Sequence, residues 1–359
     1  MSVMNLESMT SADVYASRIG RTLNSGFVAL LISVGHRTRL FDTMAQLPPS
    51  TSMQIATAAG LTERYVREWL AAMTTARVVQ YDLRTATYAL PIEYAAVLTR
   101  GAGTGNLAPA AQMLSLLASL EDLVVAGFVG GGGVVPEAYH QLDSLLAEQQ
   151  RQLIDDDFVE AMLELIPGID LRLAAGAVVL DVGCGEGTVL TALARKFPRS
   201  AFRGYDLSHE AVSRANDRAE AADLANVDFA VGDVASLEEV RVYDLILGLE
   251  TIHKQAFPRL VLRNIANALR RNGVFLMQEL AASSHVGRNV ENPFAPMLYA
   301  LSLMHAVPAA LAQEGEALGR MWGEERARQM LTDAGFAKLR FASIACDPLR
   351  YYCVASRAS

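Results

Sequence analysis

The sequence predicts an α/β fold with a doubly wound, mostly parallel sheet, preceded by an α-helical domain. Two observations support this fold class. From residue 177 onward, apolar runs such as AVVLDVG, YDLILGL and GVFLMQEL alternate with helical patterns, as expected for strands that are joined by crossover helices. Residues 1–100, in contrast, show helical periodicity with almost no strand signal until their end.

Composition limits the classes of function. A chain of 359 residues, 52% of them apolar, can form two domains with buried cores. Its net charge of −8 argues against a general binder of nucleic acid or anionic membranes. The longest uncharged apolar stretch, residues 107–120, is too short to span a bilayer. The N-terminus lacks the basic start and apolar run of a signal peptide. Three cysteines, Cys184, Cys346 and Cys353, do not suggest a disulfide framework, so we expect a protein of the reducing cytoplasm.

Residues 51–90 predict a winged helix-turn-helix. Gly60 supplies the turn, a two-stranded wing follows the second helix, and apolar positions recur there at helical spacing: Tyr65, Val66, Trp69 and Leu70. DNA binding would be the obvious role, but Glu63 and Glu68 balance the two arginines of that helix. A DNA reader needs a basic face. We therefore interpret this domain as a pairing module.

The pattern divides the chain into three parts. Residues 1–100 form the helical winged-helix domain, and residues 101–170 form a helical connector with a lid-like region around the glycine run 130–133. Residues 171–359 form the α/β domain, in which helices at about 288–330 cap the substrate site. Two successive strands, FAKLRFASIA and LRYYCVAS, close the chain as a hairpin at one sheet edge.

The stretch VVLDVGCGEGTVL, residues 178–190, carries most of the functional information. A buried strand ends at Asp181, and Gly183, Gly185 and Gly187 then allow a tight turn into a helix. Such glycines let the backbone approach a ligand closely, and the helix N-terminus favours a polar or anionic group. A dinucleotide fingerprint would have glycine where this chain has Thr188, which argues against a pyrophosphate ligand.

Acidic residues also follow the next two strands. Asp206 ends the second strand, where a carboxylate can accept hydrogen bonds from both hydroxyls of a ribose, and Asp233 ends the third, near a possible adenine amino group. Because the carboxyl ends of parallel strands meet at one sheet edge, these acids and the glycine turn are expected to form one ligand site.

With these motifs, residues 177–356 resemble class I S-adenosylmethionine-dependent methyltransferases, and the N-terminal segment resembles the winged-helix dimerisation domain of many small-molecule methyltransferases. The resemblance implies S-adenosyl-L-methionine as cofactor and a homodimer that pairs through its N-terminal domains. It also implies a set of cofactor-binding residues: Asp181, Gly183, Gly185, Gly187, Asp206, Leu207, Gly232, Asp233, Val234 and Gly248.

The end of the fourth strand reads ETIHKQ, and the resemblance places it at the methyl group. In related O-methyltransferases a His-Asp pair occurs here and the histidine is a general base. In related 2-oxo-acid C-methyltransferases the pair binds a metal together with a later helical histidine. His253 and His305 match the two histidines, but Lys254 replaces the aspartate. An ammonium has no lone pair for a metal, so we expect His253, Lys254 and His305 as catalytic residues and no metal.

The acceptor pocket is expected to draw on five side chains: Tyr139, Phe294, Met297, Tyr299 and Trp322. Arg288 and Arg320 are candidate clamps for a substrate carboxylate. The predicted function is methylation of a small metabolite in specialised metabolism. Three alternatives remain open. They are metal-assisted β-carbon methylation of a 2-oxo acid, a DNA-binding regulator that senses S-adenosylmethionine, and a non-methylating use of the cofactor pocket.

Overall fold

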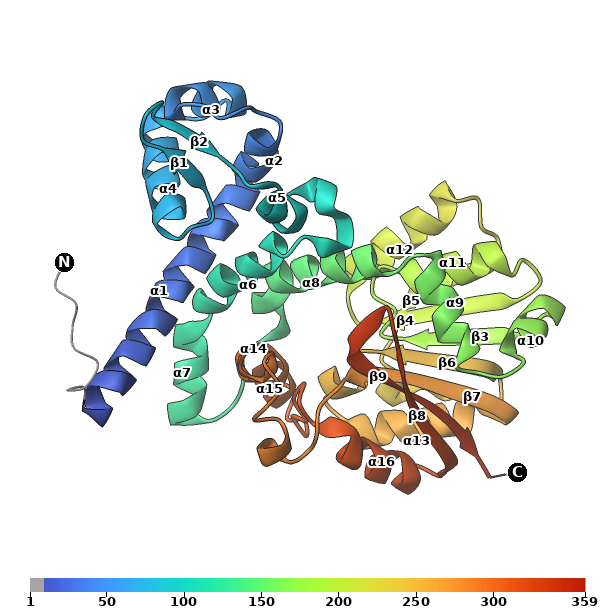
Figure 1. Ribbon diagram of the computed structural model, residues 1–359. Helices are drawn as coiled ribbons and strands as arrows, with labels where there is room; N and C mark the ends of the chain where they lie inside the picture. The colour runs from blue at the N-terminus through green and yellow to red at the C-terminus, as the bar shows by residue number, and fades with distance from the viewer. Residues whose placement is uncertain (1–9, 359) are drawn as a thin grey trace. The chain divides into compact units, whose positions relative to one another are not determined.

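The computed structural model describes residues 10–358, which divide into two compact units, 10–119 and 120–358. Figure 1 labels their elements. The first unit contains α1 (Ser11–Arg37), α2 (Leu40–Ala45), α3 (Ser52–Ala59), α4 (Glu63–Thr75), β1 (Gln80–Asp82), β2 (Thr87–Ala89), α5 (Ile92–Leu98) and α6 (Ala108–Ala118).

The first unit has the expected winged helix-turn-helix. Thr51 and Gln54 form a capping box at the start of α3, and Gly60 ends this helix in the left-handed conformation before α4 begins. α4 buries Val66, Trp69, Leu70 and Met73, and β1 pairs with β2 as the wing. Tyr65 was expected to belong to this apolar face, but it lies at the edge of the buried stripe and is 80% exposed.

The charges of α4 pair along the helix. Arg64 contacts Glu68, and Arg67 lies 3.5 Å from Glu63. Because both arginines are partnered by glutamates of the same helix, this surface offers no basic face for phosphates.

The second unit is an α/β domain with additional helices. Its helices are α7 (Glu121–Gly130), α8 (His140–Leu153), α9 (Asp156–Glu164), α10 (Ile169–Ala175), α11 (Thr188–Lys196), α12 (His209–Ala221), α13 (Pro258–Ala268), α14 (Ala295–Leu301), α15 (Val307–Leu311) and α16 (Gly323–Asp333). Its strands are β3 (Val178–Val182), β4 (Ala201–Asp206), β5 (Val227–Val231), β6 (Tyr243–Leu249), β7 (Leu269–Leu280), β8 (Phe336–Ile344) and β9 (Asp347–Arg357).

Within the described residues these strands form one seven-stranded sheet in the order β5-β4-β3-β6-β7-β9-β8. The first five are parallel, and the terminal hairpin joins β7 in antiparallel fashion. The predicted fold class is therefore confirmed. From β3, the sheet continues on one side with β4 and β5 and on the other side with β6 and β7. The chain therefore changes direction between β3 and β6, and this topology places a ligand crevice at the carboxyl ends of these two strands.

Both faces of the sheet are covered. Alternate residues point to opposite faces, so Val179, Leu245 and Leu247 pack with α9, α10, α11 and α12, whereas Leu180, Val182 and Ile246 pack with α13 and α16. Figure 1 shows these helices on either side of the strands. The two apolar layers fix the ends of β3, β4, β6 and β7, which carry the residues of interest.

The glycine run has a defined packing role within the second unit. α7 ends at Gly130, and Gly131 and Gly132 have positive φ angles of 74° and 79°. A Cβ at Gly133 would lie 2.0 Å from the carbonyl oxygen of Pro308, and Val134 donates to that oxygen. The run therefore docks against α15 rather than standing away from it.

Among residues 10–358, no single helix is both long and apolar enough to cross a bilayer. The bent pair α6–α7 meets the length and composition test only when its two helices are taken together.

Candidate active site

The glycine turn after β3 uses backbone conformations that other residues adopt only with strain. Gly183 and Gly187 both have φ of 71°, and Gly185 has φ of 53°. A Cβ at Gly183 would lie 2.5 Å from the Thr251 hydroxyl oxygen, and one at Gly187 would lie 2.4 Å from the Phe229 ring. The turn is thus held tightly against the ends of the neighbouring elements.

The acids at the strand ends surround this turn. Asp206 accepts hydrogen bonds from the backbone N–H groups of Gly185 and Ser208, both at 2.9 Å. Asp233 accepts from the Ala235 N–H at 2.8 Å and so caps a short turn after β5. Burial, together with the nearby Asp206 carboxylate, raises the pKa of Asp181 well above its usual value. One oxygen of the buried Asp181 has no partner in the described chain.

A cavity opens beside the turn. α8 supplies one wall, and the glycine turn with the ends of β3 and β6 supplies the other. The lining residues are Ala147, Gln150, Arg151, Ile154, Asp181, Gly183, Cys184, Gly185, Glu186, Thr188, Val189 and Leu249. The cavity therefore lies at the crevice that the sheet topology predicts.

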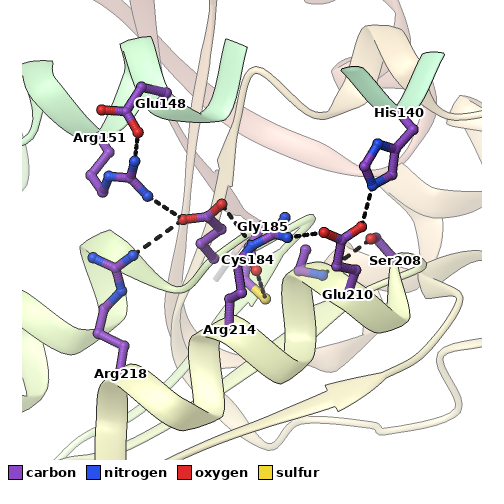
Figure 2. A network of polar contacts seen from close by, with 11 residues as sticks. His140, Glu148, Arg151, Cys184, Gly185, Ser208, Glu210, Arg214 and Arg218 are labelled. Atoms are coloured by element: carbon purple, nitrogen blue, oxygen red, sulfur yellow. Dashed lines mark hydrogen bonds and ion pairs between the residues drawn. The ribbon is translucent and has the colours of Figure 1, made fainter. Parts of the chain in front are cut away.

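A buried carboxylate ties α8 to the turn. The Glu186 side chain is 9% exposed and lies 2.5 Å from Arg151 of α8, 2.9 Å from Arg214 and 3.2 Å from Arg218 of α12. Figure 2 shows these arginines converging on one carboxylate. A second contact joins the helices where His140 lies 2.5 Å from Glu210. This network could not be predicted from the sequence, because only folding brings α8 and α12 to the same glutamate.

The remaining predicted cofactor residues lie in different surroundings. Gly232 packs against the Tyr205 ring, Val234 is buried, and Leu207 is exposed. Gly248 lies inside β6, where a Cβ would meet Phe275 at 3.0 Å. Its small size is therefore explained by sheet packing.

His253 lies in a short turn, Ile252–Lys254, directly after β6, and its side chain is completely buried. Its Nδ1 lies 2.5 Å from the Glu279 carboxylate of β7, and its backbone N–H donates to the same carboxylate at 3.2 Å. Its Nε2 has no partner in the described chain. Burial lowers the pKa of His253, and Glu279 partly opposes this shift. A neutral ring that donates from Nδ1 leaves a lone pair on Nε2.

Glu250 precedes this turn in a conformation that is rare for a side-chain-bearing residue, with φ of 51°. Its carboxylate accepts from Arg350 of β9 at 2.6 Å, and Arg350 also donates to Asp347 at 2.8 Å. Burial works against ionisation of Glu250, but the nearby arginines outweigh it and lower its pKa. This ion pair fastens the backbone that leads into the His253 turn to the terminal hairpin.

The other two predicted catalytic residues differ in exposure. Lys254 is exposed and pairs with no carboxylate of residues 10–358. His305 is buried in a π-helical turn, Ser302–Ala306, and its Nε2 lies 3.1 Å from Asp143. Its ring packs on Tyr139 with centroids 4.6 Å apart. Burial lowers the pKa of His305, and Asp143 opposes the shift.

The predicted pocket residues separate into two groups. Tyr139 and Trp322 are buried, and their hydroxyl and indole N–H have no partner in the described chain. Phe294, Met297 and Tyr299 are exposed on or beside α14. Arg288 donates to Glu325 at 2.8 Å and is largely exposed.

The donor set does not form a metal centre in the described part of the chain. No group of three or more His, Cys, Asp or Glu side chains there is arranged to hold an ion. His253 is joined to Glu279 and His305 to Asp143, so each histidine already has a separate carboxylate partner.

Comparison with known families assigns both domains. Residues 26–100 match the family described as an Rv2258c-like winged helix-turn-helix domain, and residues 173–335 match the family described as a methyltransferase domain. The two predicted domain types are confirmed.

Individual relatives agree with this result. A Nostoc punctiforme protein solved as a candidate O-methyltransferase has a TM-score of 0.71 at 18% identity, covering 97% of this chain and 99% of its own. Human N-acetylserotonin methyltransferase, solved with S-adenosylmethionine, has a TM-score of 0.66 at 17% identity and covers 100% of both chains. At such identities these likenesses show the fold.

Among curated sequences, (S)-tetrahydroprotoberberine N-methyltransferase of Eschscholzia californica is 26% identical over 110 residues, which are 31% of this chain and 31% of that protein. The chain thus matches about a third of the length of such relatives.

Proposed function

Because the chain joins a winged helix-turn-helix domain to a methyltransferase domain, we propose that it transfers the methyl group of S-adenosylmethionine to a small-molecule acceptor. The observation that carries the proposal is the cavity at the carboxyl ends of β3 and β6, which the glycine turn lines on one side. It lies where this sheet topology binds nucleoside cofactors.

The polar groups of the cavity fit the amino-acid end of that cofactor. Asp181 lines it with an unpartnered oxygen that can accept from an ammonium, and Arg151 lines it with a guanidinium that can donate to a carboxylate. Asp206 and Asp233, at the ends of β4 and β5, are the proposed partners of the ribose and the adenine. When bound, the cofactor supplies a methyl group on a positively charged sulfur.

His253 is the proposed general base. Glu279 holds Nδ1 as the hydrogen-bond donor, so the lone pair of Nε2 is free to take a proton from an acceptor hydroxyl or amine. The same carboxylate stabilises the imidazolium that results, as in other carboxylate–histidine pairs. In this arrangement Glu279 orients the base.

Binding calorimetry with S-adenosylhomocysteine tests the cofactor assignment. Asp206→Asn removes a negative charge and one acceptor oxygen, and we expect binding to weaken roughly ten- to a hundredfold. Asp228→Asn is the matched control, because Asp228 is an exposed carboxylate on the neighbouring strand that pairs with Arg203. Equal affinity of Asp206→Asn and wild type would remove the support for the cofactor site.

We further propose that two copies of the chain pair through α1. Tyr15, Ile19, Leu23 and Phe27 recur every four residues on this helix and are all exposed. Such a stripe needs an apolar partner.

Light scattering after size-exclusion chromatography tests this assembly. Leu23→Glu combined with Phe27→Glu is expected to convert a dimer into a monomer, because each charge would be buried at the apolar contact. Leu83→Glu, in the exposed turn of the wing, should leave the dimer unchanged. A double variant that stays dimeric would place the interface elsewhere.

A further inference from the structure

Arg320 is a buried cation with an unusual lack of partners. The residue is 4% exposed, and its backbone N–H donates to the Ser302 hydroxyl at 2.9 Å. Its guanidinium makes no hydrogen bond to residues 10–358, and its Nε is buried without a partner. The carboxylate paired with it, Glu250, lies 3.9 Å away. A guanidinium carries five donors, so most of its capacity is unused.

Glu250 does not compensate Arg320 fully. Its carboxylate is engaged at 2.6 Å with Arg350, which anchors the strained Glu250 backbone to the terminal hairpin. Arg320 therefore keeps only a long ion pair with Glu250, and its guanidinium donors remain unused. Buried donors normally have acceptors, and a planar carboxylate is the acceptor that a guanidinium fits best.

The position of Arg320 connects it to the proposed base. The segment 302–322 covers the turn that carries His253, since Glu316 donates to the Ala256 carbonyl at 2.8 Å and a Cβ at Gly315 would touch Ala256. α15 also packs on this turn. The positive charge of Arg320 contributes to the lowered pKa of both His253 and His305, after burial as the main cause.

Four further buried polar atoms on this segment and its neighbours lack partners in the described chain: Tyr139 hydroxyl, His253 Nε2, His305 Nδ1 and Trp322 Nε1. These groups come from separate parts of the second unit, and Tyr139 is packed on His305. Buried polar atoms in native proteins normally have partners, so these exceptions on and beside the segment that carries Arg320 favour a polar ligand.

We propose that Arg320 recognises a carboxylate of the methyl acceptor and thereby restricts the substrates to small organic acids. A planar guanidinium matches a planar carboxylate in two parallel hydrogen bonds. A doubly charged phosphate fits less well, because the buried Glu250 and Glu279 would repel its second charge. This inference rests on the proposed methyltransferase function.

The test compares acids with their primary amides, which have nearly the same shape but no charge. The probes are benzoate and benzamide, salicylate and salicylamide, and indole-3-acetate and indole-3-acetamide. Their affinities are measured by calorimetry with and without saturating S-adenosylhomocysteine, for wild type, Arg320→Met and Arg320→Lys. Arg288→Met is the matched control, since Arg288 lies in the same capping region but is exposed and paired with Glu325.

We expect wild type to bind at least one acid about tenfold or more tightly than its amide. Arg320→Met should lose this preference, Arg320→Lys should keep part of it, and Arg288→Met should keep all of it. Absence of an acid preference in every pair, or its persistence in Arg320→Met, would overturn the proposal. The binding of S-adenosylhomocysteine alone tests the proposed cofactor site. The preference for acids over amides, measured in the absence of S-adenosylhomocysteine, tests anion recognition by Arg320 even if the protein does not bind the cofactor.

Discussion

Replacing His253 with asparagine should lower kcat by roughly a hundred- to ten-thousand-fold, the range of general-base catalysis. The asparagine amide can still donate to Glu279 from near the position of Nδ1, so the buried carboxylate keeps a partner. What disappears is the lone pair of Nε2. We expect S-adenosylhomocysteine affinity to stay within about threefold of wild type, because His253 does not line the cofactor cavity.

His36→Asn provides a control for the cost of altering a buried histidine. His36 is buried in the first unit and, like His253, has a ring nitrogen without a partner in the described chain. This variant should lose stability without a comparable loss of kcat. If kcat of His253→Asn remained within about fivefold of wild type, His253 would be a structural residue and the base would lie elsewhere.

The pH profile gives an independent measure of the same group. Burial holds the pKa of His253 below its ordinary value of 6.5, and Glu279 partly opposes this. The base is active when neutral, so the acid limb of kcat/KM should fall below pH 6.5 in wild type and move further down in Glu279→Gln. An acid limb above that value would contradict the buried, neutral state of the ring.

The sign of the stability effect follows from the same shift. Between the lowered folded pKa and 6.5, the unfolded chain binds more protons at this site than the folded chain. The folded state therefore gains stability as pH rises through this window and loses it as pH falls. His253→Asn should remove this contribution from a pH series of chemical denaturation.

Gly183→Ala is the second variant with a large expected effect, and it acts on the cofactor site. Alanine at position 183 would have to adopt the left-handed backbone conformation, which costs about 1–2 kcal/mol for a non-glycine residue. Its methyl group would also lie 2.5 Å from the Thr251 hydroxyl oxygen. Thr251 is buried two residues before His253, so the turn itself must move. Because a shift of about 1 Å in an active site can cost a hundredfold, we expect cofactor affinity and kcat/KM to fall by about that factor or more.

Gly168→Ala separates backbone strain from the clash. Gly168 has φ of 75°, close to that of Gly183, but a Cβ there would meet no atom within 4 Å. Both variants should lose similar stability from the left-handed backbone, whereas only Gly183→Ala should lose cofactor affinity in calorimetry. Equal affinity in the two variants would mean that the turn does not contact the cofactor.

The sequence predicted the features that depend on neighbouring residues. Alternating apolar runs identified the sheet, and the glycines after β3 identified the turn, because both signals lie within a few positions of each other. The pairing of His253 with Glu279 was not predicted, since it depends on β6 and β7 lying side by side.

Side chains on the capping segment were the least predictable. Apolar residues at helical spacing do not reveal which face of a helix is buried, so Phe294, Met297 and Tyr299 were grouped with Trp322 although only Trp322 is buried. The three arginines around Glu186 come from α8 and α12, far from each other along the chain. Arg320 was recognised as a candidate, but only its burial and lack of partners distinguish it from the paired Arg288.

The ion pair between Glu250 and Arg350 has a consequence for anyone who divides or fuses this chain. The two residues are 100 positions apart, yet the second fixes the backbone from which the His253 turn starts. The final strand, Asp347–Arg357, therefore supports the turn that carries His253 and is not a dispensable sheet edge. A tag or a fusion partner belongs after this strand, and a split of the protein should leave β6 and β9 in the same fragment.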